Sequence, residues 1–373
     1  MEDLKLFDWP PELWQMIQSY VGYHNYRKYC VQMKIQNVLL FYDDTVICSL
    51  TTGTITSFDL ANHIKHDWPL GHDQAIRCYT TDLKMQNLVT GSEDHTLCVW
   101  DIPNHRCRTR YVGHASTVLS VFLENTIMAS GDMNGELIVW QMATGAPLYK
   151  VHTHVGEINA IVVWKEMVLS TDCWNVDIHC HGLTDGKQLP LMKGHSNHIS
   201  DMMLWNSSTV ITCALDHQLR KWTMDSKDTK LNCQILDGHK TAVLNMTRMT
   251  DIFLISCSED HHICVWNVDR GTCIHTIYGA GNMYNNMSLR LVGSSDLITM
   301  SSQLIHNESF RKYMMIQNVK DQQNYQILIE TDPFTDLNYA VCSTDSKSFV
   351  TVQIFRPYSH RAKTCIQWWK FGY

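Results

Sequence analysis

Short apolar runs, separated by Gly, Asp and Asn, recur along most of the chain. Residues 75–79, 87–90 and 96–100 show the pattern well, because apolar types alternate or cluster there between turn-forming residues. Runs of this length and composition are typical of short β-strands. The pattern therefore predicts an all-β fold made of many short strands.

These strand-like runs belong to a repeat. The decamer GSEDHTLCVW, residues 91–100, returns 166 positions later as CSEDHHICVW, residues 257–266. Two weaker copies, GDMNGELIVW and CALDHQLRKW, end at Trp140 and Trp222. Six residues before its closing Trp, each copy has an Asp or an Asn: Asp94, Asn134, Asp216 and Asp260.

A histidine marks the start of each copy. Gly-His pairs precede the four decamers at His72, His114, His195 and His239, and a weaker pair, Thr153-His154, lies between the second and the third. The five histidines are 42, 40, 41 and 44 residues apart. Such a regular period indicates one repeated structural unit, with about four short strands in each copy.

A period of this length, with Gly-His near its start and Trp-Asp near its end, resembles the WD-repeat family, most plainly over residues 71–267. The resemblance implies a β-propeller with one blade per repeat. It also implies a buried hydrogen-bonded network in each blade, joined by a Ser or Thr of the middle strand, either Thr90 or Ser92 in the first clear copy. A buried carboxylate is tolerated only where donors satisfy its oxygens. We assign to this structural network, rather than to catalysis or metal binding, His72, Asp94, Trp100, His114, Asn134, Trp140, His195, Asp216, Trp222, His239, Asp260 and Trp266.

Weaker copies extend the repeat in both directions. Residues 45–59 fit a blade with Phe58 in place of Trp, and residues 168–181 fit one in which a small or polar residue replaces the Trp. Strand-like runs in residues 288–318 and 337–369 supply two more. The count is then eight blades, or seven if two of the weaker segments are loops or share one blade. Residues 29–35 are suited to pair with the C-terminal strands, which would close the ring and remove its open edge.

The N-terminal segment, residues 1–22, differs from the propeller predicted for residues 23–373. Two prolines precede a short helix whose apolar residues lie on one face. Its sequence resembles the first helix of the F-box, which implies binding to a Skp-type adaptor of a cullin ubiquitin ligase. The resemblance covers about one helix, and the rest of an F-box bundle is missing, so a helix that caps the propeller is the alternative. The residues that the resemblance assigns to adaptor binding are Pro11, Leu13, Ile17 and Val21.

Composition narrows the partners and the compartment. The 373 residues are 45% apolar and 18% charged, with a formal net charge of -7 and no long basic run, so we expect neither nucleic acid nor a membrane surface as a partner. The N-terminus lacks the pattern of a secretory signal, and no apolar run is long enough to span a bilayer. The 14 Cys residues form no CxxC pair. Reduced thiols in a cytoplasmic or nuclear protein are the simplest interpretation.

No motif indicates an enzyme. The chain has no Gly-rich phosphate loop, no GxSxG and no HExxH, so we expect no catalytic residue, no metal and no cofactor. The ligand-like cluster His179-Cys180-His181 offers at most two His on one face of a strand, and polar filler is the preferred interpretation. The family resemblance favours a substrate-recognition subunit of an SCF-type cullin ubiquitin ligase. A WD-repeat scaffold for complex assembly, with no role in ubiquitin transfer, is the alternative.

The resemblance also implies that partners bind one rim of the propeller, through the residue before the tight-turn Asp and two residues at the start of the first long strand. Receptors of the family that bind phosphorylated segments carry several Arg there. This rim has one Arg and three Glu, which predicts a neutral or basic partner segment; ordinary solvated Glu side chains are the alternative. The rim residues are Arg77, Glu93, Met133, Glu157, Asn159, His198, Ser200 and Glu259.

Overall fold

All regular elements that the structure describes are β-strands. The computed structural model of the protein describes residues 23–31, 35–42, 44–62, 64–69, 71–82, 84–224, 231–248, 250–260, 262–278, 288–292, 296–305, 309–318, 324–327, 335–342, 348–355 and 363–371. The described residues contain no helix. The N-terminal helix predicted within residues 1–22, with Pro11, Leu13, Ile17 and Val21, lies outside them.

The strands form eight antiparallel four-stranded sheets. Four sheets come from the first half of the chain, each made of consecutive strands. They are β2 (Ile35–Tyr42), β3 (Thr45–Leu50), β4 (Ile55–Asp59) and β5 (Ile64–Trp68); β6 (Ile76–Thr81), β7 (Asn87–Ser92), β8 (Thr96–Asp101) and β9 (Arg106–Val112); β10 (Val118–Glu124), β11 (Ile127–Asp132), β12 (Glu136–Gln141) and β13 (Pro147–His152); and β14 (Ile158–Trp164), β15 (Met167–Asp172), β16 (Ile178–Gly182) and β17 (Gln188–Met192).

The second half supplies three further sheets of consecutive strands and most of the last one. They are β18 (Ile199–Asn206), β19 (Thr209–Ala214), β20 (Leu219–Met224) and β21 (Leu231–Leu236); β22 (Val243–Arg248), β23 (Phe253–Ser258), β24 (His262–Asn267) and β25 (Thr272–Tyr278); β26 (Ser288–Val292), β27 (Asp296–Ile305), β28 (Ser309–Asn318) and β29 (Asn324–Ile327); and β30 (Thr335–Cys342), β31 (Ser348–Phe355), β32 (Lys363–Phe371) and β1 (Tyr23–Val31).

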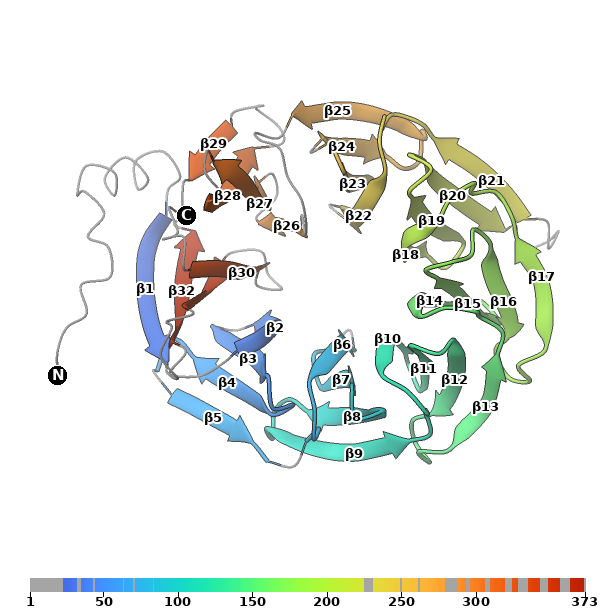
Figure 1. The fold of residues 1–373 in the computed structure, drawn as a ribbon, viewed down its shortest axis with the longest axis horizontal. Coiled ribbons are helices and arrows are strands. Elements are labelled where there is room, and N and C mark those ends of the chain that lie inside the picture. Colours follow the sequence, from blue (N-terminus) through green and yellow to red (C-terminus); the bar gives the residue numbers. More distant parts are fainter. Residues whose placement is uncertain are drawn as a thin grey trace.

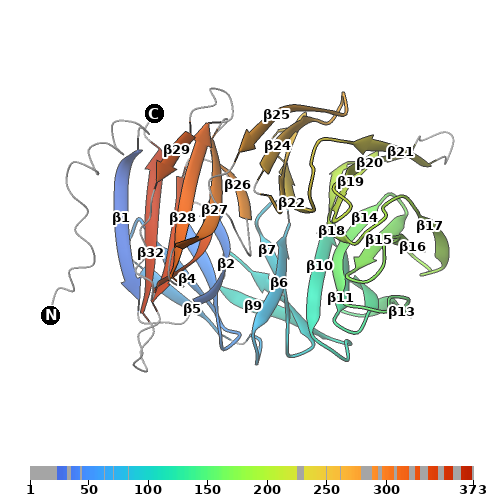
Figure 2. The ribbon, with the colours of Figure 1, turned by 45° about the horizontal axis from the view of Figure 1, so that its top comes forward.

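The sheets are arranged in a ring, with the first strand of each sheet innermost and the last strand on the circumference (Figure 1). The inner strands β6, β10, β14 and β18 lie side by side, and β30 contacts β2, so the succession of sheets returns to its start. In the tilted view the same inner strands line the inside of the ring (Figure 2). The described sheets therefore have the arrangement of a propeller.

One sheet joins the two ends of the chain. β1 pairs antiparallel with β32, with Tyr29 opposite Ile366 and Val31 opposite Thr364. The sheet therefore combines an early strand with three late ones, which removes a free edge. The predicted closure is confirmed, although the strand ends at Val31 and Ile35 already begins the next sheet.

The core lies between neighbouring sheets. One buried cluster joins Leu39 and Ile47 of the β2–β5 sheet to Leu88 and Trp100 of the β6–β9 sheet, and others repeat this arrangement around the ring. Strands buried on both faces explain the dense Val, Ile and Leu runs. Trp100, Trp140, Trp222 and Trp266 are at most 1% exposed. Burying a large apolar side chain of this kind contributes about 2–3 kcal/mol, so each repeated Trp anchors its sheet.

The two weaker copies within the described side chains have the predicted strands. Val46 pairs with Phe58 in the register by which Leu88 pairs with Trp100, so Phe58 takes the place of the Trp. Residues 168–181 form most of β15 and β16, with His181 opposite Val168 at that same place. The all-β propeller fold expected from the sequence is confirmed. The blade count of eight stays a prediction with which the eight sheets agree.

Candidate functional site

The first clear repeat contains a continuous chain of hydrogen bonds. Trp100 Nε1 donates to Thr90 Oγ1 at 2.8 Å, and Thr90 Oγ1 lies 2.8 Å from His72 Nε2. His72 Nδ1 lies 3.1 Å from both carboxylate oxygens of Asp94. Because the hydroxyl accepts from the indole, its own proton is free for Nε2, which places the imidazole proton on Nδ1, facing Asp94. Thr90 is therefore the middle-strand member; Ser92 instead donates to the carbonyl of Gln74.

The same arrangement returns with small changes in the other repeats. In the β18–β21 sheet, Trp222 Nε1 donates to Thr212 at 2.9 Å, His195 Nε2 lies 2.7 Å from Thr212, and His195 Nδ1 lies 2.8 Å from Asp216. Ser130 joins Trp140 to His114 at 2.8 and 2.7 Å. The network residues predicted for these sheets come together, except at the carboxylate position of the β10–β13 sheet.

The assignment of Asn134 to the network is wrong. The carboxylate that faces His114 is Asp132, two residues earlier, with Oδ2 at 3.3 Å from His114 Nδ1. Asp132 ends strand β11 and is fully buried, whereas Asn134 lies exposed in the turn. The other oxygen of Asp132 accepts the backbone N–H groups of Asn134 and Glu136. Alignment on the Trp selects the turn position, and only the folded turn shows that the strand-end position reaches the histidine.

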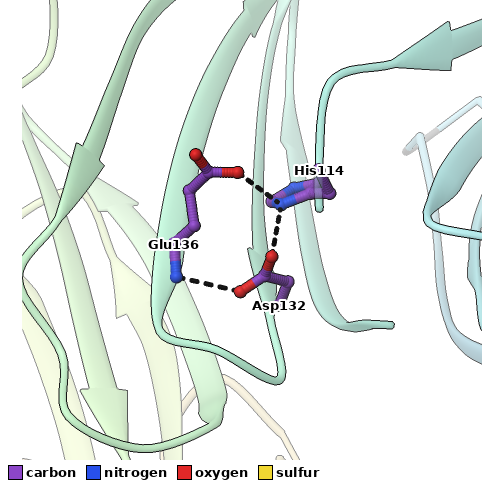
Figure 3. A group of neighbouring side chains, drawn as sticks. All are labelled: His114, Asp132 and Glu136. Atoms are coloured by element: carbon purple, nitrogen blue, oxygen red, sulfur yellow. Dashed lines mark hydrogen bonds and ion pairs between the residues drawn. The ribbon is translucent and has the colours of Figure 1, made fainter. Parts of the chain in front are cut away.

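Glu136 also faces His114, with Oε2 at 3.5 Å from Nδ1, as Figure 3 shows. His114, Asp132 and Glu136 are the one group of three potential metal ligands that the described part of the chain brings together, with ligand atoms within 4.8 Å of one another. Lys150 Nζ lies 3.4 Å from Glu136, however, and Nδ1 sits where the other repeats hold a proton between His and Asp. A cation would have to displace both, so we interpret the group as the same structural network with an added carboxylate.

Asp260 departs from the prediction in a different way. It accepts from Ser258 Oγ at 2.6 Å and pairs with His262 at 2.8 Å. His239 Nε2 bonds Ser256, which also accepts from Trp266, but His239 Nδ1 is closest to the sulfur of Cys264, at 3.7 Å. Asp260 therefore supports the turn and acts on His239 only through space.

The β14–β17 sheet keeps the histidine and its hydroxyl partner but has no Trp in the network. His154 bonds Ser170 at 2.7 Å and Asp172 at 3.0 Å, so its carboxylate also comes from the strand end. His181 replaces the Trp, is fully buried, and neither of its ring nitrogens has a hydrogen-bond partner among the described residues. The ring of His179 lies 4.2 Å from that of His154. The His179-Cys180-His181 cluster therefore belongs to the interior of this sheet.

The surroundings lower the pKa of two of these histidines and also that of Asp94. Burial lowers the pKa of His154 to about 4, and the neighbouring His179 adds to the effect. Burial also lowers the pKa of His239 to about 4. For Asp94, burial opposes ionisation, but the hydrogen bonds from His72, Thr96 and the Asp73 amide outweigh it and hold its pKa well below the usual range. At neutral pH the imidazoles of His154 and His239 are therefore neutral, and the carboxylate of Asp94 is ionised.

The predicted rim residues are positioned by a repeated backbone contact. In five sheets the residue after the second strand donates its N–H to the carbonyl of a residue at the start of the first strand. The pairs are Glu93 to Ala75 (3.0 Å), Met133 to Thr117 (2.9 Å), Cys173 to Glu157 (3.2 Å), Leu215 to His198 (2.9 Å) and Glu259 to Ala242 (2.8 Å). The contact presents one row of side chains along the inner part of the rim.

The rim side chains are not all free for a partner. Arg77 forms an ion pair with Glu93. Asn159 Nδ2 donates to the carbonyl of Ile199 at 2.8 Å, and Ser200 Oγ donates to that of Val243, so both link neighbouring sheets. Met133, by contrast, is 52% exposed. The structure brings all eight predicted residues to one rim, and their role in binding stays a prediction.

Sequence reasoning missed Trp174, which is 69% exposed and lies on this rim. It lies two residues after the end of the second strand, as Asp94 and Asp216 do in their own repeats. The repeat around Trp174 has no Trp at the end of its third strand. An alignment of the repeats on that Trp therefore did not include this turn. An aromatic residue at a turn position was the available signal.

The other end of the inner strands is hollowed. A cavity of about 810 Å³ lies between the ends of β6, β10, β14 and β18, opposite to the rim. Apolar side chains such as Phe122 and Met202 share its wall with Glu124 and Lys84. Burial raises the pKa of Glu124, as expected for a carboxyl group there.

No helix in the described part of the chain has the length and apolar character needed to cross a membrane.

Comparison with known proteins agrees with this geometry. The family model of the WD domain, G-beta repeat, matches residues 65–101 and 231–267. An uncharacterized WD repeat-containing protein of Schizosaccharomyces pombe is 26% identical over 170 residues, covering 41% of this chain and 46% of that protein. The small ribosomal subunit protein RACK1y of Oryza sativa subsp. japonica is 29% identical over 85 residues, 22% of this chain and 25% of its own length. The chain therefore contains WD40 repeats and has WD-repeat relatives, of which it matches less than half the length.

Solved structures show the same fold at low identity. The computationally designed Ika8 protein superposes with a TM-score of 0.65 and 18% identity, covering 90% of this chain and 96% of that one. The WD40 β-propeller domain of Doa1 superposes with a TM-score of 0.55 and 16% identity, covering 76% of this chain and 94% of that one. At these identities the likeness establishes the propeller fold alone.

Proposed function

We propose that the protein is a scaffold for protein interaction, and that its rim at the start of the inner strands binds a neutral or basic segment of a partner. The observation that carries the proposal is the backbone contact repeated in five sheets, which presents a row of side chains along one rim. The histidines of the repeats are committed to internal hydrogen bonds, so they are not available for chemistry. WD40 propellers generally act as non-enzymatic scaffolds, which agrees with this reading.

The charge of the rim supports the preference for a neutral or basic segment. Arg77 is the one Arg among the eight rim residues, and Glu93 already neutralises it. Glu157 and Glu259 have no ion pair within the described part of the chain. A doubly phosphorylated segment needs several free Arg or Lys side chains, because each phosphate takes bidentate, charge-assisted hydrogen bonds. The rim offers excess negative charge instead.

Charge reversal on the rim tests the proposal. Immobilised wild type and a Glu157→Lys, Glu259→Lys double variant would be incubated with the same cell extract, with and without phosphatase. We expect partners to remain bound to wild type after phosphatase treatment and to be absent from the variant sample. Glu166→Lys is the matched control, because Glu166 is exposed in the turn between β14 and β15, at the opposite end of the inner strands. Binding that disappears with phosphatase, or that the rim variant retains, would contradict the proposal.

The finer proposal is that the scaffold is the substrate receptor of an SCF-type ubiquitin ligase. Its support is the resemblance of the N-terminal segment to an F-box helix, with Leu13 and Ile17 on the apolar face. Co-purification with a Skp-type adaptor tests it, comparing wild type with a Leu13→Asp, Ile17→Asp double variant. Adaptor in the wild-type sample alone is the expected result. Its absence from both samples would leave the scaffold without a role in ubiquitin transfer.

A further inference from the structure

Three exposed apolar side chains gather on the rim where the β10–β13 and β14–β17 sheets meet. Val155 is 85% exposed, Trp174 is 69% exposed and Met133 is 52% exposed. We call these three residues the Trp174 patch. Single exposed apolar residues are common on protein surfaces, but a group of them on a rim marks a contact site more often.

The backbone brings together the loops that carry these three side chains. A Cβ atom at Gly135 would meet the carbonyl oxygens of His154 and Gly156, so the turn that carries Met133 lies against the loop that carries Val155. A Cβ atom at Gly156 would collide with the indole ring of Trp174. The ring therefore lies against the bare backbone of that glycine, and most of its surface faces solvent.

Trp174 is held in this place by the exchange of carboxylates described above. Asp172 takes over the contact to His154 and also accepts the N–H of Trp174 at 2.8 Å. Residue 174 therefore does not have to supply the carboxylate that Asp94 and Asp216 supply in their repeats. A turn position that elsewhere supports the fold has here become a surface position with an aromatic side chain.

Glu157, a carboxylate without an ion pair in the described part of the chain, lies beside the Trp174 patch. Cys173 donates its N–H to the carbonyl of Glu157, so Glu157 lies beside the turn of Trp174. Glu157 has no ion pair among the described residues. Lys150 of β13 is already paired with Glu136, and Lys193, which follows β17, is paired with Asp177. An aromatic face next to a free carboxylate is complementary to a cationic side chain.

We propose that the Trp174 patch is the anchor site for an Arg or Lys side chain of a partner segment whose flanking residues are apolar. The cation lies on the indole face of Trp174 and pairs with Glu157, while Met133 and Val155 contact the flanking residues. Trp is the residue type that most often dominates a protein interface, and Met adapts to different apolar partners. The inference rests on the proposed function of the rim and names the chemistry that the rim selects.

An oriented peptide array tests it on the full-length protein. Ten-residue peptides carry a fixed central Arg, Lys, Ala, Glu or phosphoserine between degenerate positions. We expect wild type to bind the Arg and Lys sets at least tenfold above the Ala set. Trp174→Ala should abolish this preference, Trp174→Phe should retain part of it, and Glu157→Gln should weaken it about threefold. Val112→Ala, which changes another exposed apolar residue, on the outer strand β9, should bind as wild type does.

Each outcome decides a different part of the argument. Equal binding of the Arg, Lys and Ala sets, or no binding, overturns the proposed anchor. Preference for Arg and Lys that survives Trp174→Ala but not Glu259→Lys overturns the anchor and leaves the rim function standing. Preference for the phosphoserine or Glu set overturns both. Thermal unfolding midpoints of the variants within a few degrees of wild type show that the comparison reports binding.

Discussion

The β18–β21 and β14–β17 sheets are neighbours in the ring and solve the same structural task with different residues. In the first, Trp222 and Thr212 hold His195, and the turn residue Asp216 faces the imidazole. In the second, Ser170 and Asp172 hold His154, and His181 fills the place of the Trp. Both arrangements fix the loop before the first strand to the second strand of its sheet.

The difference between the two sheets shows what the histidine, hydroxyl and carboxylate positions of the network each contribute. The hydroxyl and the histidine occur in both sheets, so their contact fixes the loop before the first strand. The carboxylate is needed near Nδ1, yet it can come from the turn or from the strand end. When the carboxylate comes from the strand end, the turn residue does not need to be acidic. In the β14–β17 sheet that turn residue is Trp174. In the β14–β17 sheet, His181 is also buried without a hydrogen-bond partner among the described residues.

The largest expected effect comes from the indole that one sheet has and the other lacks. Trp222→Ala removes a fully buried ring and the donor to Thr212, so it should lower the free energy of unfolding by about 3–5 kcal/mol. His181→Ala removes a smaller ring whose nitrogens are unpaired, and should cost clearly less. Thermal unfolding of both variants measures the difference. Equal losses would show that the two positions carry the same weight.

The next largest expected effect is a loss of folding stability at acidic pH. The folded protein holds His154 and His239 with pKa values of about 4, below the ordinary value of 6.5. A histidine whose pKa is lowered by folding binds protons better when unfolded, so stability is full above about pH 6.5 and is lost as the pH falls towards 4. Each histidine contributes a loss on the order of 3 kcal/mol over this window.

Urea unfolding at pH 7 and pH 5 measures this loss. His181→Phe serves as a matched variant, because it removes one buried ionisable ring from the crowded sheet and keeps its volume filled. We expect the variant to lose less stability between the two pH values than wild type does. A stability that rises on acidification would contradict the assignment of neutral buried imidazoles.

The placement of the carboxylate in the β10–β13 sheet gives a smaller but sharper test. Asp132→Ala leaves the amides of Asn134 and Glu136 without their acceptor and removes the carboxylate that faces His114, at a cost of about 1–3 kcal/mol. Asn134→Ala changes an exposed turn residue and should cost less than about 0.5 kcal/mol. Thermal unfolding of the two single variants decides between them. A larger loss for Asn134 would restore the assignment made from the sequence alignment.

The smallest expected difference lies between two carboxylates that share the turn position. Asp94 bonds His72 directly and also pairs with Arg110, whereas Asp260 bonds Ser258 and His262. Asp94→Ala should therefore cost about 2 kcal/mol and Asp260→Ala about 1 kcal/mol, since fewer buried groups lose a partner. Chemical unfolding of each variant against wild type measures both. Identical losses would mean that the contact to the histidine adds nothing at this position.

Much of the fold could be predicted because the repeat is written in residues with fixed local roles. The Trp positions, the Gly-His pairs and the strand pattern placed the middle strands of the β6–β9, β18–β21 and β22–β25 sheets within a few residues. The candidate site was harder. Asn134 and Asp132 are two positions apart in one strand and turn, and sequence spacing alone does not show which side chain points towards His114. Trp174 was missed for a different reason, since its repeat lacks the Trp on which the others align.

The sequence by itself determined the repeated unit, because the period, the buried Trp and the hydroxyl that accepts its N–H are local features that recur in four copies. Tertiary structure decided which carboxylate serves each histidine, how β1 joins β32, and which turn residues reach the surface. Those outcomes depend on contacts between segments far apart in the chain. The direction of a side chain at a turn is set by the backbone that packs against it, which in the case of Trp174 is the bare backbone of Gly156.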